Sequence, residues 1–556
     1  MRITSKLGKM VTAHRLKVLY ATFFLASSLF AQETHNLEII WQRGIVDSLF
    51  YSYGDEISSG DFNGDGYSDI VVGGDSAVDF LHGIYIAKAY IFFGGPQFDT
   101  IPDVVIASDT TWGFLRVKGI GDINGDGCDE LALGSQHGPD NYGRVYIYLG
   151  GNPMDTICDF QVRGPHSGSA FGQAIGSGDV NGDGLSDLIV GAYMATPPGG
   201  SYGMGQVFIY FGDTSFRTVP NVVLNGGHEN DLEGFGSTVA GGGDVNQDGF
   251  SDIIVGAGNH SGGGRIYIYF GGNPMNTIYD VALSGGTQGS IGWSGISFLI
   301  NRGYYDHALI GNEMWRGGGD DFKGKVCVLF GGPNMDSVPD AIMVGRTDTS
   351  RLGSCVASGF FDNDEFGDIL AGAPTEPNNN RFAGSAYLWL GGMSLDTTPD
   401  AWMRGTQLDE GIGWMVASAG DVDGDDKDEI MVSNYTSLAT PKRVWVCKYT
   451  GSGIGEERLT HDAKRLTPEI SPNPAKSLVR IRYPLPVKEV KIHDITGKIV
   501  RVLEINKVST SEQCEMKWDL RDNNQKKVAT GIYLLEISAE NGKSITGDIR
   551  KITVIK

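Results

Sequence analysis

Short runs in which apolar and polar residues alternate recur along the chain, and many of them end in glycine. Residues 144–150 read Arg-Val-Tyr-Ile-Tyr-Leu-Gly, and residues 265–271 read Arg-Ile-Tyr-Ile-Tyr-Phe-Gly. Alternation of this kind, in runs rich in β-branched and aromatic residues, is typical of half-buried strands. Clusters of Gly, Asn, Asp and Pro between the runs indicate turns. The pattern therefore predicts an all-β chain of many short strands.

The strands belong to a unit that the chain repeats seven times. Its most regular phrase is Asp-Phe-Asn-Gly-Asp-Gly-Tyr-Ser-Asp at residues 61–69, followed by an apolar run. A Phe-Gly pair or a variant of it precedes most copies, and a Gly-Ala pair or a variant follows the apolar run. The spacing between copies stays between 55 and 65 residues, and the copies begin at residues 61, 122, 179, 244, 299, 360 and 421. Each repeat supplies about four predicted strands.

A four-stranded unit of this size cannot bury both of its faces alone, whereas repetition around an axis buries them. The sequence therefore predicts a seven-bladed β-propeller over residues 32–451. The first repeat is preceded only by the strand-like residues 37–41, and the last repeat ends at residues 443–449. We infer that the two ends share one blade and close the ring. An open β-solenoid is the alternative, although its coils are usually shorter than these repeats.

Composition supports a folded protein and argues against one class of ligand. Glycine accounts for 82 of 556 residues, while proline is ordinary at 20 and apolar residues reach 40%, which argues against a disordered chain. The net charge of −23 argues against binding to nucleic acid through phosphate contacts.

Residues 1–31 contain five Lys and Arg residues, no acidic residue and a 14-residue apolar run, a pattern typical of a secretory signal peptide. A membrane anchor is the alternative, but the run is shorter than the roughly 20 residues that a spanning helix needs. No other stretch is long enough, so we expect a protein that is not integral to the membrane. We also expect a monomer. The six cysteines show no regular spacing, and we assign no disulfide; Cys327 and Cys447 lie in apolar runs and are expected in the core.

The repeated acidic phrase predicts a metal site. Oxygen side chains at positions 1, 3 and 5, a main-chain carbonyl at position 7 and a carboxylate at position 9 can surround one Ca²⁺ ion, which takes six to eight oxygen ligands. Glycines between them allow the positive φ angles that turn alternate oxygens inward. Five copies keep the pattern, which predicts about five calcium sites. The predicted ligands are Asp61, Asn63, Asp65, Tyr67 and Asp69; Asp122, Asn124, Asp126, Cys128 and Glu130; Asp179, Asn181, Asp183, Leu185 and Asp187; Asp244, Asn246, Asp248, Phe250 and Asp252; and Asp421, Asp423, Asp425, Lys427 and Glu429.

Two other copies depart from the pattern. The fifth has Leu299, Asn301, Gly303 and His307 at the ligand positions, so we predict no metal there. The sixth keeps Asp362, Asp364 and Asp368 but begins with Phe360, which leaves its occupancy open. For any single loop the simpler interpretation is that Asp, Asn and Gly make good turns. Mg²⁺ is a weaker candidate because it favours compact octahedral sites that retain several waters.

These features resemble the FG-GAP repeats of the integrin α-subunit propeller. The likeness rests on the Phe-Gly pairs, on Gly-Ala-Pro at residues 372–374 and on the acidic loops, and it covers residues 37–451. It implies calcium loops on one rim of the propeller and binding loops on the opposite rim. Fold alone does not fix the function.

Residues 452–466 form a predicted polar linker, and the charge balance of the chain changes after it. Residues 467–556 hold 16 Lys and Arg against 11 Asp and Glu, and their alternating runs predict a small antiparallel β-sandwich. Pro-Asn-Pro at residues 472–474 and Gly-Ile-Tyr at residues 531–533 make this part similar to the C-terminal sorting domain of type IX secretion substrates. It also resembles a FlgD-type immunoglobulin-like tail. The first resemblance implies contact with secretion machinery and an address outside the cell or on the outer-membrane surface. A plain accessory sandwich is the alternative.

No catalytic motif stands out, and most Asp residues belong to the predicted calcium loops, so the sequence favours a binding protein over an enzyme. The leading hypothesis is a secreted or surface-bound calcium propeller that binds a glycan or protein ligand. A calcium-dependent polysaccharide lyase or hydrolase and a structural envelope component are the alternatives. Trp293 and Trp414 could stack on sugars, but their place beside Phe-Gly positions favours the core.

Overall fold

The computed structural model describes two compact units. In the first unit it describes residues 33–45, 53–79, 84–108, 115–137, 140–227, 232–286, 289–316, 322–362, 364–378, 381–392, 397–435 and 442–451, and residues 395–396 are described as part of the second. In the C-terminal part it describes residues 469–471, 479–483, 487–494, 498–504, 514–523, 525–539 and 550–554. The predicted signal peptide and linker lie outside these residues.

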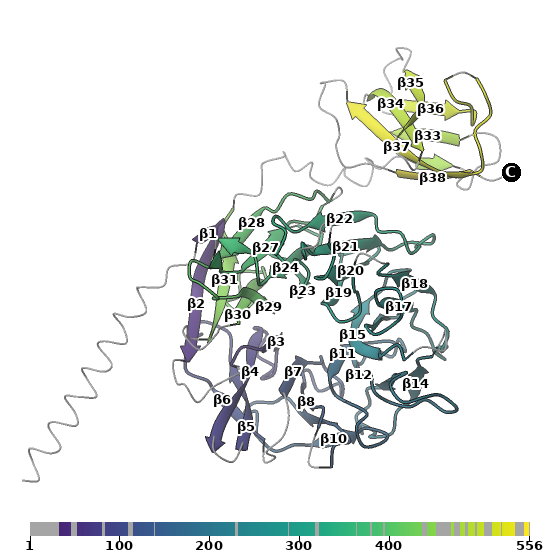
Figure 1. Cartoon of the computed structure of the whole chain (residues 1–556). Helices are drawn as coiled ribbons and strands as arrows, with labels where there is room; N and C mark the ends of the chain where they lie inside the picture. The colour runs from purple at the N-terminus through teal and green to yellow at the C-terminus, as the bar shows by residue number, and fades with distance from the viewer. Residues whose placement is uncertain are drawn as a thin grey trace, which may run out of the picture. The chain divides into compact units, whose positions relative to one another are not determined.

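The first unit is a seven-bladed β-propeller, which confirms the predicted fold (Figure 1). Each blade is built on four antiparallel strands, and in the first six blades the earliest of these four in the chain faces the centre of the ring. The first three blades comprise β3 (Glu56–Gly60), β4 (Asp69–Asp79), β5 (Ile84–Phe92) and β6 (Val104–Ala107); β7 (Leu115–Gly119), β8 (Leu131–Ser135), β9 (Arg144–Tyr148) and β10 (Phe160–Arg163); and β11 (Ala174–Gly178), β12 (Asp187–Ala192), β13 (Gln206–Tyr210) and β14 (Val222–Asn225).

The next three blades follow the same plan. They comprise β15 (Phe235–Gly243), β16 (Asp252–Ala257), β17 (Arg265–Tyr269) and β18 (Val281–Ser284); β19 (Ile296–Leu299), β20 (His307–Asn312), β21 (Lys325–Phe330) and β22 (Ala341–Val344); and β23 (Val356–Gly359), β24 (Asp368–Ala373), β27 (Ser385–Trp389) and β28 (Ala401–Arg404). A two-stranded hairpin, β25 (Pro377–Asn378) with β26 (Arg381–Phe382), projects from the sixth blade.

The seventh blade joins the two ends of the propeller. It contains β29 (Ile412–Gly420), β30 (Glu429–Asn434) and β31 (Lys442–Tyr449), and its outer strand is β2 (Leu37–Ile45). β2 runs antiparallel to β31, with Leu37 opposite Tyr449 and Ile45 opposite Lys442. The predicted closure is therefore confirmed. A further strand, β1 (Glu33–His35), was not expected from the sequence; it pairs with β28 and adds a fifth strand to the sixth blade.

Buried side chains fill the spaces between neighbouring blades, and the Phe-Gly pairs explain part of this packing. Phe171 is fully buried against Val145 of the second blade and Phe208 of the third. Gly172, the next residue, has φ = 82°, and a Cβ there would lie 2.7 Å from the carbonyl oxygen of Arg144. The aromatic ring thus fills the space between blades, while the glycine allows the close backbone approach that seats it.

The inner strands surround a central cavity of about 580 Å³. Among the described residues that line it, the charged side chains are Glu56, Arg116 and Lys118, and Glu56 forms an ion pair with Arg116. Most of the remaining lining consists of small or polar side chains.

The described C-terminal strands form two antiparallel sheets and no helix. One sheet contains β32 (Glu469–Ser471), β33 (Val479–Tyr483) and β36 (Cys514–Trp518). The other contains β34 (Val487–Asp494), β35 (Ile499–Glu504), β37 (Gly531–Ala539) and β38 (Arg550–Val554). The arrangement as a sandwich remains a prediction.

Candidate metal loops

The seven repeated loops, which include the two that depart from the acidic pattern, lie on one rim of the propeller. Each connects the inner strand of a blade to the second strand, as residues 61–68 connect β3 to β4. Because the blades repeat one topology, the loops fall at the same end of every inner strand. We call this end the acidic rim and the other end the opposite rim.

In the first loop, backbone N–H groups fix the orientation of the acidic side chains. The N–H of Asp65 donates to Asp61 Oδ1 at 3.1 Å, and that of Gly66 donates to Asp61 Oδ2 at 2.9 Å. Asn63 Oδ1 also accepts from the N–H of Asp65, at 2.8 Å. Gly64 and Gly66 have φ angles of 71° and 88°, a conformation that L-residues with side chains rarely adopt. The same bond to the position-1 carboxylate recurs in the next three loops, from the N–H groups of Gly127, Gly184 and Gly249.

The side chain at position 9 is the buried part of each loop. Asp69 is fully buried, and its two carboxylate oxygens accept from the N–H groups of Phe62 (2.8 Å) and Gly94 (2.9 Å). Burial raises the pKa of Asp69 to about 7 and that of Glu130 to about 8, and nearby loop carboxylates act in the same direction. The corresponding pKa values of Asp187 and Asp252 rise to about 7 and about 8 for the same reason.

A bound cation would relieve this electrostatic cost. A carboxylate that loses hydration and lies beside other carboxylates is stabilised in its charged form by a positive charge. The donors that the first four loops offer are side-chain oxygens of Asp, Asn and Glu, which suit a hard divalent cation. The residue types present in these loops therefore fit such an ion.

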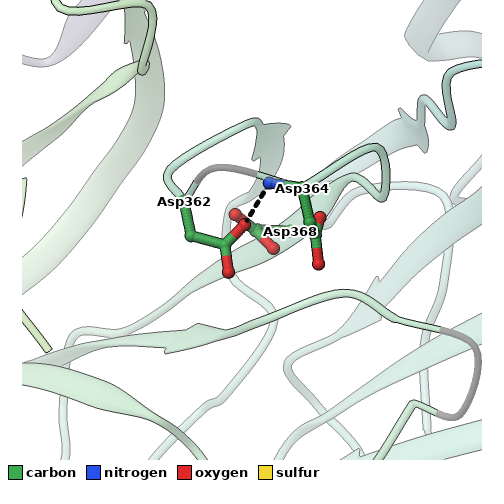
Figure 2. Close-up of side chains that lie close together, drawn as sticks. All are labelled: Asp362, Asp364 and Asp368. Atoms are coloured by element: carbon green, nitrogen blue, oxygen red, sulfur yellow. Dashed lines mark hydrogen bonds between the residues drawn. The ribbon is translucent and has the colours of Figure 1, made fainter. Parts of the chain in front are cut away.

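The sixth loop is organised more fully than the sequence indicated. Oxygen atoms of Asp362, Asp364 and Asp368 lie within 4.8 Å of one another, and Figure 2 shows the three side chains gathered at one place. Asp368 is fully buried and accepts from the N–H groups of Phe361 and Gly391. Phe360 occupies position 1, where its ring lies 4.2 Å from the guanidinium of Arg302 in the preceding loop.

The fifth loop carries a neutral version of the same framework. His307 replaces the carboxylate at position 9, and its Nδ1 accepts from the N–H of Gly331 at 3.2 Å. Burial lowers the pKa of His307 to about 4, so the imidazole is neutral at physiological pH. This loop has no concentration of negative charge at its ligand positions.

The seventh loop brings together Asp421, Asp423 and Glu429, with oxygen atoms within 4.8 Å of one another. Lys448, which was not among the predicted site residues, extends from β31 into this cluster and forms ion pairs with Asp423, Asp425 and Glu429. Partial burial disfavours its charge, but the hydrogen bonds to Asp423 and Asp425 outweigh it and raise the pKa of Lys448 above its usual value. The signal was present in the sequence, because the aligned position is Phe or Leu in the other six repeats.

The loops are also linked to one another around the rim. At six of the seven junctions, the N–H at position 8 of one loop donates to the position-1 carbonyl of its neighbour. The donor–acceptor pairs are Asp129–Asp61, Ser186–Asp122, Ser251–Asp179, Asp306–Asp244, Asp428–Phe360 and Ser68–Asp421. At the remaining junction, Gly367 N–H donates to the side-chain oxygen of Asn301 at 3.1 Å. The loops thus form one hydrogen-bonded ring.

The opposite rim exposes aromatic side chains, which corrects one expectation. Trp293 and Trp414 were expected in the core, but they are 40% and 37% exposed. Each contacts another aromatic ring of the same rim. The ring centroids of Trp293 and Tyr193 lie 5.1 Å apart in an edge-to-face arrangement, and those of Trp414 and Tyr435 lie 4.7 Å apart. A residue beside a Phe-Gly pair can therefore point outward, because the Phe position already fills the space between blades. Cys327 and Cys447 are buried as expected.

Comparison with protein families agrees with this architecture. Residues 53–86, 171–210 and 235–269 match the FG-GAP repeat, and residues 122–190 match an FG-GAP-like repeat. Residues 469–553 match the secretion system C-terminal sorting domain. The resemblance to FG-GAP propellers and to a sorting domain is confirmed, and the sorting domain identifies a secreted or cell-surface protein. In the part of the chain that the structure describes, no helix has the length and apolar character to cross a membrane.

Curated relatives include integrin α subunits. The chain is 33% identical to integrin alpha-5 of Xenopus laevis over 217 residues, which cover 36% of this chain and 19% of the relative. It is 32% identical to integrin alpha-PS2 of Drosophila melanogaster over 188 residues, which cover 33% of this chain and 13% of the relative. It is 36% identical to integrin alpha-6 of Gallus gallus over 155 residues, which cover 26% of this chain and 14% of the relative. The matched region thus spans a fifth or less of each relative's length.

Proposed function

We propose that this protein is a secreted or surface-bound binding module, stiffened by calcium on its acidic rim, that engages a glycan or protein ligand on its opposite rim. The observation that carries the proposal is that the two rims differ in the side chains they present. One rim gathers buried carboxylates in a ring of linked loops, and the other exposes aromatic side chains. The similarity to integrin α subunits, together with the sorting domain, supports an extracellular binding role.

The calcium part of the proposal rests on the acidic loops. In the first four, side-chain oxygens at positions 1, 3 and 5 accompany a buried carboxylate at position 9. The sixth supplies three carboxylates in a similar cluster. These five loops are our proposed calcium sites. A divalent ion in each would offset most of the negative charge and rigidify the linked loops, and hence the strands on which the opposite rim is built.

The ligand part rests on the chemistry of the opposite rim. Trp293, Trp414 and Tyr435 present flat apolar faces, and Tyr202 is 53% exposed in the same set of connections. Aromatic side chains supply large contact areas at low entropic cost, and Tyr and Trp add a polar group at the edge. Such a surface suits the apolar face of a sugar ring or an apolar protein anchor.

A binding array tests the proposal. The full chain would be applied to immobilised glycans and matrix proteins in millimolar calcium and again in EDTA. The variants would be Trp293→Ala and Trp414→Ala, with Ile278→Ala as the control, because Ile278 is 73% exposed in a connection at the acidic rim. We expect calcium-dependent binding that the two tryptophan variants weaken and the control does not.

Two results would contradict the proposal. Binding that persists in EDTA would remove the role of calcium, and binding that is insensitive to both tryptophan variants would remove the role of the opposite rim. Absence of any binding by folded protein would favour a structural component of the cell envelope.

A further inference from the structure

Two adjacent residues at the end of β31 distinguish the seventh blade from the other six. After the third strand of a blade, the chain places an apolar residue over the acidic loop, and a glycine follows it. The N–H of that glycine donates to the side chain at position 9, as Gly94 does to Asp69 and Gly391 does to Asp368. In the seventh blade the two residues are Lys448 and Tyr449. The apolar residues of the other blades are Phe93, Leu149, Phe211, Phe270, Phe330 and Leu390.

Losing the glycine donor leaves a carboxylate oxygen of Glu429 without its usual partner. Glu429 Oε2 accepts from the N–H of Val422 at 2.9 Å, as the equivalent atom does in the first four loops. Glu429 Oε1 is buried and accepts no hydrogen bond from any described residue. Lys448 Nζ lies 3.8 Å from this oxygen.

Lys448 occupies the place that a cation would take in this loop. Besides Glu429, its ammonium contacts Asp423 and lies 2.8 Å from Asp425 Oδ2. Its side chain is only 25% exposed. An ammonium group donates up to three hydrogen bonds to carboxylate oxygens, whereas Ca²⁺ needs six to eight oxygens at about 2.3–2.6 Å. The two cations cannot share these oxygens, and the lysine is already attached to the chain.

We propose that Lys448 takes the place of the calcium ion that the sequence of the seventh loop predicts, so that this blade keeps its loop ordered without metal. The inference rests on the proposed calcium binding of the other loops. It assigns Lys448 as a tethered cation and limits the calcium sites to the first four loops and the sixth.

The location of Lys448 gives this substitution a consequence. Lys448 belongs to β31, where it stands opposite Glu38 of β2 in the pairing that closes the ring. The loop with its own cation therefore lies in the closing blade. Closure of the ring would remain stable at calcium concentrations that empty the other loops.

Reciprocal substitutions test the proposal in the full chain. Lys448→Leu introduces the residue found at this position in the second and sixth blades. Leu149→Lys introduces the lysine over the second loop, which shares a Glu at position 9 with the seventh. Lys427→Leu is the control, because it removes a lysine from the seventh loop at a position whose predicted ligand is the main-chain carbonyl. Native mass spectrometry would count bound calcium, and melting in EDTA would report metal-free stability.

We expect Lys448→Leu to bind one more calcium ion than the wild type, Leu149→Lys to bind one fewer, and Lys427→Leu to bind the same number. In EDTA, Lys448→Leu should melt at a lower temperature than Lys427→Leu. Equal stoichiometry for folded wild type and Lys448→Leu, or full occupancy in Leu149→Lys, would overturn the proposal.

The melting comparison separates this proposal from the one on which it rests. If no variant binds calcium, the proposed calcium sites fail. A lower melting temperature of Lys448→Leu in EDTA would still support the lysine as the cation of the seventh loop, and equal melting of Lys448→Leu and Lys427→Leu would contradict it.

Discussion

The first four acidic loops and the last three follow the same backbone plan but deal with charge in different ways. The first four concentrate Asp, Asn and Glu around a buried carboxylate. The fifth replaces that carboxylate with neutral His307, the sixth places Phe360 where the first ligand would be, and the seventh inserts Lys448. Their framework bonds nevertheless persist in most positions, including the link from each loop to the next.

This difference shows that the backbone framework of the rim does not depend on the charged side chains that would bind metal. The fifth loop keeps the bond from the glycine after the third strand, with an imidazole nitrogen as the acceptor. The seventh loses that bond but keeps the one from position 2 to position 9. A repeat can therefore lose its charge, or supply a cation of its own, without losing its place in the ring. Calcium dependence should vary from blade to blade although the fold does not.

Removing calcium from the whole protein should give the largest effect. Each site stabilises the native state by about 4 kcal/mol when free calcium is about a thousand times the dissociation constant. Melting of the full chain in millimolar calcium and in EDTA would measure the sum, with magnesium added to EDTA-treated protein as the control for ion identity. An unchanged melting temperature would show that the charged loops, like the neutral one, gain no stability from calcium.

A single ligand should account for one site. Asp183→Ala removes the position-5 carboxylate of the third loop, and we expect it to lower stability by up to about 4 kcal/mol in saturating calcium. In EDTA the change should stay within about 0.5 kcal/mol, as for other exposed substitutions. Asp155→Ala is the matched control, since Asp155 also accepts a backbone N–H two residues ahead but lies outside the loops. Equal losses in the two conditions would indicate a structural role for Asp183.

The fifth loop should show the opposite behaviour. Asn301→Ala leaves the N–H of Gly367 without its acceptor, and an unsatisfied buried group costs about 1–3 kcal/mol. Because no metal is expected in this loop, the loss should be the same in calcium and in EDTA. Asn246→Ala, at position 3 of the fourth loop, should instead cost more in calcium. Calcium-dependent behaviour of Asn301→Ala would contradict the neutral assignment.

The smallest effect concerns pH. The folded-state pKa of His307, about 4, lies below its usual value of 6.5, so the unfolded state binds the proton first as the pH falls. The stability that neutral His307 contributes is present above pH 6.5 and is lost between pH 6.5 and 4, by about 1 kcal/mol at pH 5.5. In saturating calcium, His307→Asn should reduce the slope of stability against pH in this range. An unchanged slope would show that His307 does not titrate in this way.

The sequence could predict features that repeat, because repetition exposes the pattern. The seven acidic phrases, the Phe-Gly pairs and the unpaired runs at each end were sufficient for seven blades and a shared closing blade. They were not sufficient for features that arise from a single exception. The ion pairs of Lys448, and the substitution of the Asn301 side chain for a backbone acceptor, depend on how neighbouring blades approach each other. Likewise, the outward direction of Trp293 follows from space already filled by the residues around it.

The pairing of β2 with β31 also bears on the order in which the protein folds. Its two strands lie about 400 residues apart in the chain, and joining such distant segments is slow because loop-closure entropy must be overcome first. The hairpins within each blade join residues that are close in sequence and can form early. We therefore expect a folding intermediate with formed blades and an open seam, which exposes the unpaired edge of β31. Hydrogen exchange during refolding should show protection of β2, whose only partner in the blade is β31, among the last events.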